Sequence, residues 1–184
     1  MTLDRIDFEI LDALQNDARL ANKELAAKVN LAPSSCLTRV RALTEAGILR
    51  GHHADVAASA LGIGIQALLA IRLVKHSSET CRTLYQYMLG LPETLAVFHV
   101  TGVNDLQVHV ALRDVAHLRE LIVERVATRP QVAHCETSVI YASDRKHRLP
   151  CYNDHEPPAR APRAPRKARG LTPARSARAR RSSS

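Results

Sequence analysis

The chain has 184 residues, a formal charge of +8 and 46% apolar residues. This length allows one domain of ordinary size or two small ones, and either can bury a core. The charge lies at one end: residues 157–184 hold nine Arg or Lys and no acid, which leaves the other 156 residues with 17 basic and 18 acidic side chains. The isoelectric point near 9.8 therefore belongs to the tail, and it does not by itself make the folded part a nucleic-acid binder.

Several classes of protein are excluded by the same reading. The longest unbroken apolar run, residues 67–71, is far shorter than the roughly 20 residues of a membrane helix. The N-terminus is acidic where a signal peptide is basic and then apolar. The four cysteines form no CxxC pair, which argues against a disulfide framework or a structural zinc site. We expect a cytoplasmic protein with no membrane partner and no cofactor.

Residues 1–50 predict three short helices. Asp4 is suited to cap the first helix and Asn22 the second. The third has Pro33 in its first turn and stops at Gly47. Two helices joined by a turn of three or four residues are typical of a helix-turn-helix unit.

The third helix has a free face that suits DNA. Its apolar residues Cys36, Val40 and Leu43 point inward, which leaves small hydroxyl residues and arginines outside. Hydroxyl groups bond phosphates or base edges, and Arg reads guanine in the major groove. The alternative is an ordinary solvated helix face. The predicted DNA contacts are Ser34, Ser35, Thr38, Arg39 and Arg41.

After a connecting strand and hinge at residues 51–62, the spacing of apolar residues changes from a helical to a strand-like pattern. Strands are expected at 63–74, 95–101, 106–112 and 132–142. One helix follows a cap at Ser77 or Ser78, and another follows Asp114 and buries Val115 with three further apolar residues. The order strand, helix, strand, strand, helix, strand predicts a ferredoxin-like domain at 63–146, and hence an α+β protein.

The hairpin between the second and third strands bears on assembly. With a loop at 102–105, Val97 faces Val110 and Phe98 faces His109. Leu95 then lies on the core face. The opposite face still carries apolar residues that need a cover, and a second copy of the chain would supply it, so we expect a homodimer. These residues are Ala96, Phe98, Val100 and Ala111.

Residues 147–184 are expected to be a disordered basic tail, because 157–184 contain only small, Pro and basic residues apart from Leu171. Nine positive charges would add non-specific DNA affinity; the alternative is a solubilising extension. His147, Cys151 and His155 have metal-binding side chains, but Pro150 interrupts any helix that would align them. With no fourth ligand evident, we expect no metal site.

Three stretches carry a family resemblance. Residues 3–11 (LDRIDFEIL), 33–40 (PSSCLTRV) and 45–49 (EAGIL) resemble the leucine-responsive/asparagine regulator (Lrp/AsnC) family of prokaryotic transcription factors. The turn 101–106 and the closing residues 136–138 are similar to that family's effector domain. The resemblance implies a winged helix-turn-helix joined to a ferredoxin-like sensing domain. It also implies dimers through the sheets, assembly up to octamers, and an amino-acid effector between subunits.

Effector contacts in this family cluster around a Gly-x-x-Asp turn and the sheet beside it. The resemblance therefore implies an effector site at Gly102, Val103, Asn104, Asp105 and His109. The same turn has a structural use, because Gly permits a positive φ and Asp caps a turn. His109 is equally a candidate for a hydrogen-bonded interface residue.

The sequence departs from the family at three places. Ala32 stands where Ser often caps the helix, His52 stands where Tyr is frequent, and the basic tail is not part of the pattern. The sequence predicts a sequence-specific, nucleoid-associated regulator controlled by a small effector. The alternative is an architectural protein that coats DNA through its oligomer and tail. No nucleophile elbow, phosphate-binding glycine loop or paired-carboxylate cleft is present, so we expect no enzyme.

Overall fold

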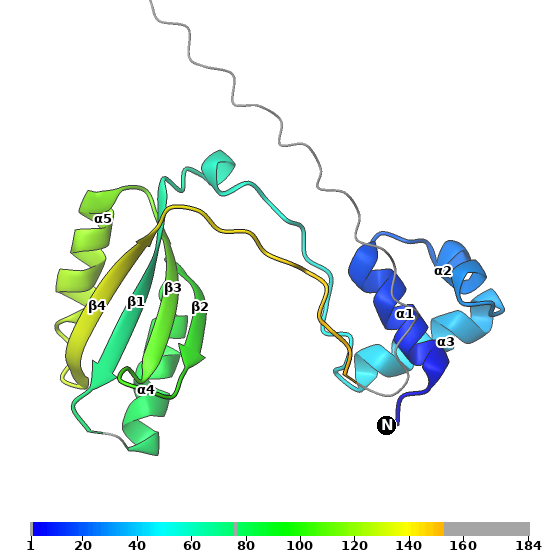
Figure 1. Cartoon of the computed structure of the whole chain (residues 1–184), viewed down its shortest axis with the longest axis horizontal. Helices are drawn as coiled ribbons and strands as arrows, with labels where there is room; N and C mark the ends of the chain where they lie inside the picture. Colours follow the sequence, from blue (N-terminus) through cyan, green and yellow to red (C-terminus); the bar gives the residue numbers. More distant parts are fainter. Residues whose placement is uncertain (1, 76, 153–184) are drawn as a thin grey trace, which may run out of the picture. The chain divides into compact units, whose positions relative to one another are not determined.

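The structure, a computed structural model, describes residues 2–75 and 77–152 (Figure 1). The chain divides into two compact units. One contains the residues up to Leu49 together with the segment that begins at Arg148, and the other is Arg50–His147. Among the described residues, the structure has no helix with the length and apolar character needed to span a membrane.

The first unit is a three-helix bundle of α1 (Arg5–Asn16), α2 (Asn22–Lys28) and α3 (Pro33–Glu45). Each helix is short and contributes one apolar stripe to a common core. The stripes meet at side chains that are less than a tenth exposed: Ile10, Leu14, Leu25, Ala26, Val29, Cys36 and Leu43.

The helix ends in this unit agree with the sequence at three places and differ at one. Asp4 caps α1, with its side chain accepting the backbone N–H of Asp7 at 2.9 Å. Pro33 is the first residue of α3, and Gly47 follows its end with φ +69°. The expected cap at Asn22 is wrong: α2 is preceded by Ala21, and Asn22 is its first helical residue. The Asn22 side chain instead donates its amide to the Pro33 carbonyl at 2.8 Å, so it joins α2 to α3.

The second unit has the predicted order of strands and helices. Its sheet contains β1 (Ile65–Leu73), β2 (Thr94–His99), β3 (Leu106–Leu112) and β4 (Val132–Ile140). Helix α4 (Ser78–Leu89) follows β1, capped by Ser77 as expected. Helix α5 (Val115–Glu120) is capped by Asp114 and continues as a π-helix over Leu121–Val126.

The sheet is antiparallel with strand order β2-β3-β1-β4, which confirms the ferredoxin-like fold (Figure 1). Alternate residues of β1 and β3 are almost fully buried, and α4 and α5 cover that face. The opposite face has no covering helix among the described residues. The core is therefore one-sided, and one broad face of the sheet remains open.

The hairpin between β2 and β3 differs from the expected register by two residues. The loop is 101–104, because Val100 donates its N–H to the Asp105 carbonyl. Val97 therefore pairs with Val108, and Phe98 with Gln107. A shift of two keeps Val97 and Phe98 on their predicted faces, since side chains alternate along a strand.

Three further expectations are corrected. Leu95 lies at a bulge between Thr94 and Ala96, so it is 52% exposed instead of facing the core. Val115, in the first turn of α5, is 68% exposed and not part of the core. Residues 51–62 form no strand; they are irregular up to a 3-10 turn at Ala58–Leu61.

The predicted disordered tail begins at residue 147, but in the structure Arg148 and Leu149 bond to α1. The predicted disorder of residues 153–184 lies outside the described residues.

Gly64 precedes β1 at a position with no room for a side chain. A Cβ there would overlap the carbonyl oxygen of Arg113, a backbone atom directly after β3 and not the end of a flexible side chain. We expect Gly64→Ala to lower the free energy of unfolding by about 1–3 kcal/mol, measured by urea denaturation. Gly90→Ala is the matched control, since its Cβ would meet only ordinary contacts at 3.5 Å. Equal midpoints for the two variants would contradict this prediction.

Candidate functional site

The outer face of α3 is the candidate DNA-binding surface. Its core residues Cys36 and Leu43 are fully buried, so the opposite side of the helix faces solvent. The structure brings four of the five predicted contacts together on the exposed surface of this helix. They are Ser34, Ser35, Thr38 and Arg41.

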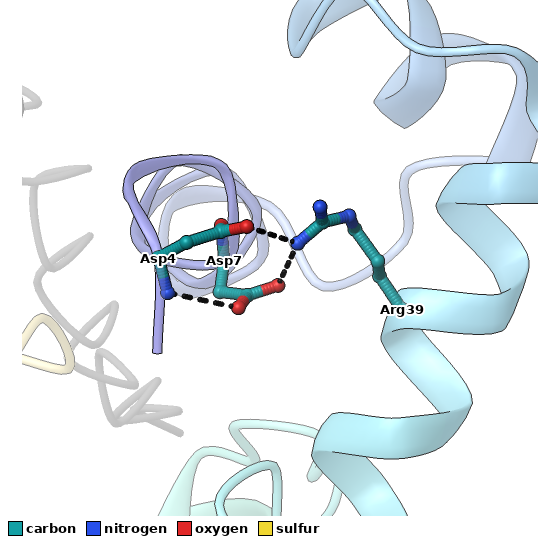
Figure 2. A network of polar contacts seen from close by, with 3 residues as sticks. All are labelled: Asp4, Asp7 and Arg39. Atoms are coloured by element: carbon teal, nitrogen blue, oxygen red, sulfur yellow. Dashed lines mark hydrogen bonds and ion pairs between the residues drawn. The ribbon is translucent and has the colours of Figure 1, made fainter. Parts of the chain in front are cut away.

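The fifth predicted contact, Arg39, is only partly exposed, and its side chain is bonded to α1. One nitrogen of its guanidinium, Nη1, lies 2.7 Å from Asp4 Oδ2 and 2.8 Å from Asp7 Oδ1 (Figure 2). Both carboxylates belong to the N-terminal end of α1, so this single group connects α1 to α3. The arrangement makes Arg39 a residue that positions α3 against α1.

Asp7 explains why Arg39 occupies this place. The Asp7 carboxylate is only 4% exposed, and a buried charge is stable only with a charged or hydrogen-bonding partner. Its other oxygen accepts the Asp4 N–H at 3.1 Å, completing a capping box. The sequence alone gives no signal for this pair, because an acidic residue at the third position of a helix is already accounted for by a capping box.

The charges of Asp4 and Arg39 support each other. The hydrogen bond from the Asp7 N–H, and then the bond from Arg39, lower the pKa of the Asp4 carboxyl below its usual value of 3.8. The hydrogen bonds to the Asp4 and then the Asp7 carboxylate raise the pKa of Arg39. Asp4 and Arg39 therefore stay charged at neutral pH.

The N-terminal turn of α3 is open. Ala32 precedes the helix and makes no side-chain cap, so the N–H groups of the first turn are not satisfied by a capping hydroxyl. Thr38 Oγ1 donates to the Ser34 carbonyl at 3.0 Å, which fixes its rotamer and leaves its oxygen able to accept. Beneath this surface the Cys36 thiol packs in the core. Burial raises its pKa, so the thiol is poorly reactive.

The predicted effector turn has a structural role in the second unit. Asp105 Oδ2 accepts the Leu73 N–H at 2.8 Å, and the Asp105 N–H donates to the Ile71 carbonyl at 2.9 Å. Asp105 therefore fastens the hairpin turn to the end of β1. Gly102 has φ +124°, a conformation that favours glycine, and Val103 beside it is 77% exposed.

His109 lies apart from this turn on the open face of the sheet. It is four residues along β3 from Asp105, roughly 13 Å of strand. Its Nε2 lies 2.8 Å from Gln66 Oε1. Burial, and then the charge of Arg145, lower the pKa of His109, so the ring is neutral at pH 7 and forms this bond uncharged. Within one chain, residues 102–105 lie together in the turn, and His109 lies apart from them.

No group of three metal-ligating side chains occurs in the described parts of the chain. His155, the third member of the segment considered above, lies outside those residues.

Comparison with known proteins agrees with both units. Residues 3–50 match the model of a winged helix-turn-helix DNA-binding domain, and residues 66–149 match that of the Lrp/AsnC ligand binding domain. A regulator named AldR from Mycolicibacterium smegmatis is 38% identical over 76% of this chain and 81% of its own length. The chain belongs to the Lrp/AsnC family of transcriptional regulators.

Other Lrp/AsnC proteins show the same likeness. The leucine-responsive regulatory protein of Rhizobium meliloti is 32% identical over 71% of this chain and 83% of its own. A regulator from Neisseria meningitidis, solved as an L-Met complex, superposes with a TM-score of 0.74 at 27% identity, covering 81% of this chain and 97% of that one. These relatives are transcriptional regulators and not enzymes, which favours regulation over the architectural alternative.

Removing Arg39 is expected to reduce stability more than an exposed arginine does. In Arg39→Ala the buried Asp7 loses its cation, and we expect the free energy of unfolding to fall by about 2 kcal/mol. Arg41→Ala, an exposed change two positions along the same helix, should alter it by less than about 0.5 kcal/mol. Urea titrations of both variants check this. If Arg39→Ala unfolds like the parent, the positioning role is wrong.

Proposed function

We propose that this Lrp/AsnC regulator recognises a specific DNA sequence with α3 and that an amino-acid effector controls this binding. The observation that carries the proposal is the exposed face of α3, where Ser34, Ser35, Thr38 and Arg41 lie together above a buried core. In this assignment Arg41 contacts DNA directly, and Arg39 holds the helix at its angle to α1.

The effector part rests on the ligand-binding domain and on its open turn. The match over residues 66–149 assigns a ligand-binding domain, and the similar Neisseria protein binds L-Met. Residues 102–105 offer backbone groups and Asn104 beside the exposed Val103. We place the effector here, between two subunits, with His109 of the sheet face contributing as a neutral hydrogen-bonding group.

The open face of the sheet supports a homodimer. Phe98 is 50% exposed there, and Leu68 and Ala96 on the same face are half-buried. A second copy of the chain would remove these side chains from water, and the closed two-fold pairing of identical faces is the commonest way that chains assemble. Association of two or more such dimers would then give larger assemblies, and four dimers would make an octamer.

DNA specificity is tested by selecting bound duplexes from a randomised pool with the full-length chain, then titrating the selected sequence beside a shuffled one. A preference of at least two orders of magnitude is expected at physiological salt. If no sequence is enriched, the regulator proposal fails and the architectural alternative leads.

Two threonines of α3 provide a matched pair for locating the DNA face. Thr38 and Thr44 are both exposed, and both donate to the carbonyl four residues earlier. Helical periodicity turns Thr38 away from the core, whereas Thr44 lies on the flank. Thr38→Ala is expected to weaken operator binding about tenfold, the effect of one lost base contact. Thr44→Ala should change it less than twofold. Equal losses of operator affinity in the two variants would contradict a DNA contact at Thr38.

Effector binding and operator binding must affect each other by the same factor. Calorimetric titration of candidate amino acids, with and without operator duplex, is expected to give different affinities. Val103→Glu should abolish effector binding, because it places a carboxylate at the turn, while Val115→Glu, an equally exposed valine on α5, should not. Identical effector affinities with and without operator would contradict the coupling.

Charge on the open sheet face is expected to separate the dimer. Phe98→Glu and Leu89→Glu replace side chains that are 50% and 49% exposed, but Leu89 lies on the helix layer. Sedimentation at micromolar concentration should show monomers for Phe98→Glu and the parent assembly for Leu89→Glu. Retained dimers in Phe98→Glu would show that another surface mediates assembly.

A further inference from the structure

The open face of the sheet carries two charges of opposite sign on neighbouring strands. In β1 the side chains of Ile71 and Leu73 enter the core, so Arg72 between them lies on the open face, where it is exposed. In β4, Glu136 pairs with Ala70 of β1, and paired residues point to the same side of a sheet. Glu136 is exposed as well. A cation and an anion therefore share this face on adjacent strands.

The two charges are close enough to act on one small molecule. Arg72 pairs with His134, which precedes Glu136 by two residues, so Arg72 and Glu136 are diagonal neighbours in the sheet. Such positions are about 7–8 Å apart, within reach of long side chains. Among the residues that the structure describes, neither side chain forms an ion pair or a hydrogen bond. His134 brings no negative charge to Arg72, so both charges are available to a ligand.

Arg72 also lies beside the turn at residues 102–105. Asp105 bonds to the residues on either side of Arg72, because its N–H donates to the Ile71 carbonyl and its carboxylate accepts the Leu73 N–H. The backbone of Arg72 is therefore directly across from Asp105. The turn has the sequence GVND and contains no cation. Arg72 supplies the positive charge that the turn lacks.

A free α-amino acid carries both charges on one carbon atom. Its carboxylate matches the guanidinium of Arg72, since a guanidinium binds a carboxylate with two parallel N–H groups. Its ammonium group matches the carboxylate of Glu136. A phosphate or a keto acid would be repelled by Glu136, and a simple amine would be repelled by Arg72. The pair therefore fits a ligand that carries both signs and has no net charge at this end.

We propose that Arg72 binds the α-carboxylate and Glu136 the α-ammonium group of the effector, so that this pair selects free amino acids over their amides and N-acylated forms. The inference rests on the proposed function in one respect, that an amino acid is the effector and binds beside residues 102–105. It names the two side chains that recognise the part common to all amino acids.

The selection is tested by calorimetric titration of the full-length chain with each of the protein amino acids. The one that binds most tightly is then compared with its α-amide, which lacks the negative charge, and with its N-acetyl form, which lacks the positive charge. Each derivative should bind the parent about tenfold more weakly or worse, because one charged hydrogen bond is lost. A derivative that binds as tightly as the free amino acid would overturn the proposal.

Two variants assign the charges to the residues. Arg72→Gln should weaken binding of the amino acid about tenfold but change binding of its amide less than about twofold, since the amide has no carboxylate to lose. Glu136→Gln should weaken binding of the amino acid equally and spare the N-acetyl form. The matched controls are Arg82→Gln and Glu120→Gln, exposed residues of α4 and α5 in the helix layer, which should leave every affinity unchanged.

An amino-acid affinity that is unchanged in Arg72→Gln or in Glu136→Gln would overturn the pair. Equal losses for the amino acid and its amide in Arg72→Gln would also overturn it, because they would assign Arg72 to assembly, which sedimentation of the variant checks. The two proposals fail in different ways. If no amino acid binds the parent, the effector part of the proposed function is wrong and this inference falls with it. If one binds and both variants retain it, only this inference is wrong.

Discussion

The Arg39 guanidinium, shared by Asp4 and Asp7, is the interaction on which the DNA-binding unit depends. A helix as short as α3 has little stability of its own, and its orientation comes from what it contacts. The apolar core holds it at a distance from α1, but apolar contacts allow some sliding. A charged group bonded to two fixed carboxylates removes that freedom, because one of them is buried and cannot remain without a cation. The exposed side chains of α3 are thus positioned by a residue that lies among them in the sequence and points towards α1.

The second unit is governed by a different constraint, a sheet with helices on one face only. The core under β1 and β3 is built from the residues of one chain. The open face is only partly apolar, and carries the Gln66–His109 pair as well as Phe98. Such a mixed surface suits an interface that also holds a polar ligand, since it supplies both contact area and hydrogen-bonding groups.

The sequence predicted the fold because the spacing of its apolar residues and the positions of its helix-capping residues indicate the same elements. Ser77, Asp114 and the alternation along β3 all pointed to the observed elements. The hairpin register was less accessible, since a bulge at Leu95 depends on contacts across the sheet and has no local signature. On α3, helical periodicity identified the exposed face but did not reveal that Arg39 turns towards α1. That contact joins residues 32 positions apart, and only the burial of Asp7 in three dimensions requires it.

The bond between Leu149 and Gln15 also bears on how the protein is made. These residues are 134 positions apart, and a ribosome needs on the order of 10 s to synthesise the chain between them. All of Arg50–His147 is translated in that interval. The helices of the DNA-binding unit therefore leave the ribosome before the segment that begins at Arg148 can bond to α1. The order of translation thus completes the ligand-binding unit before the last contacts of the DNA-binding unit form.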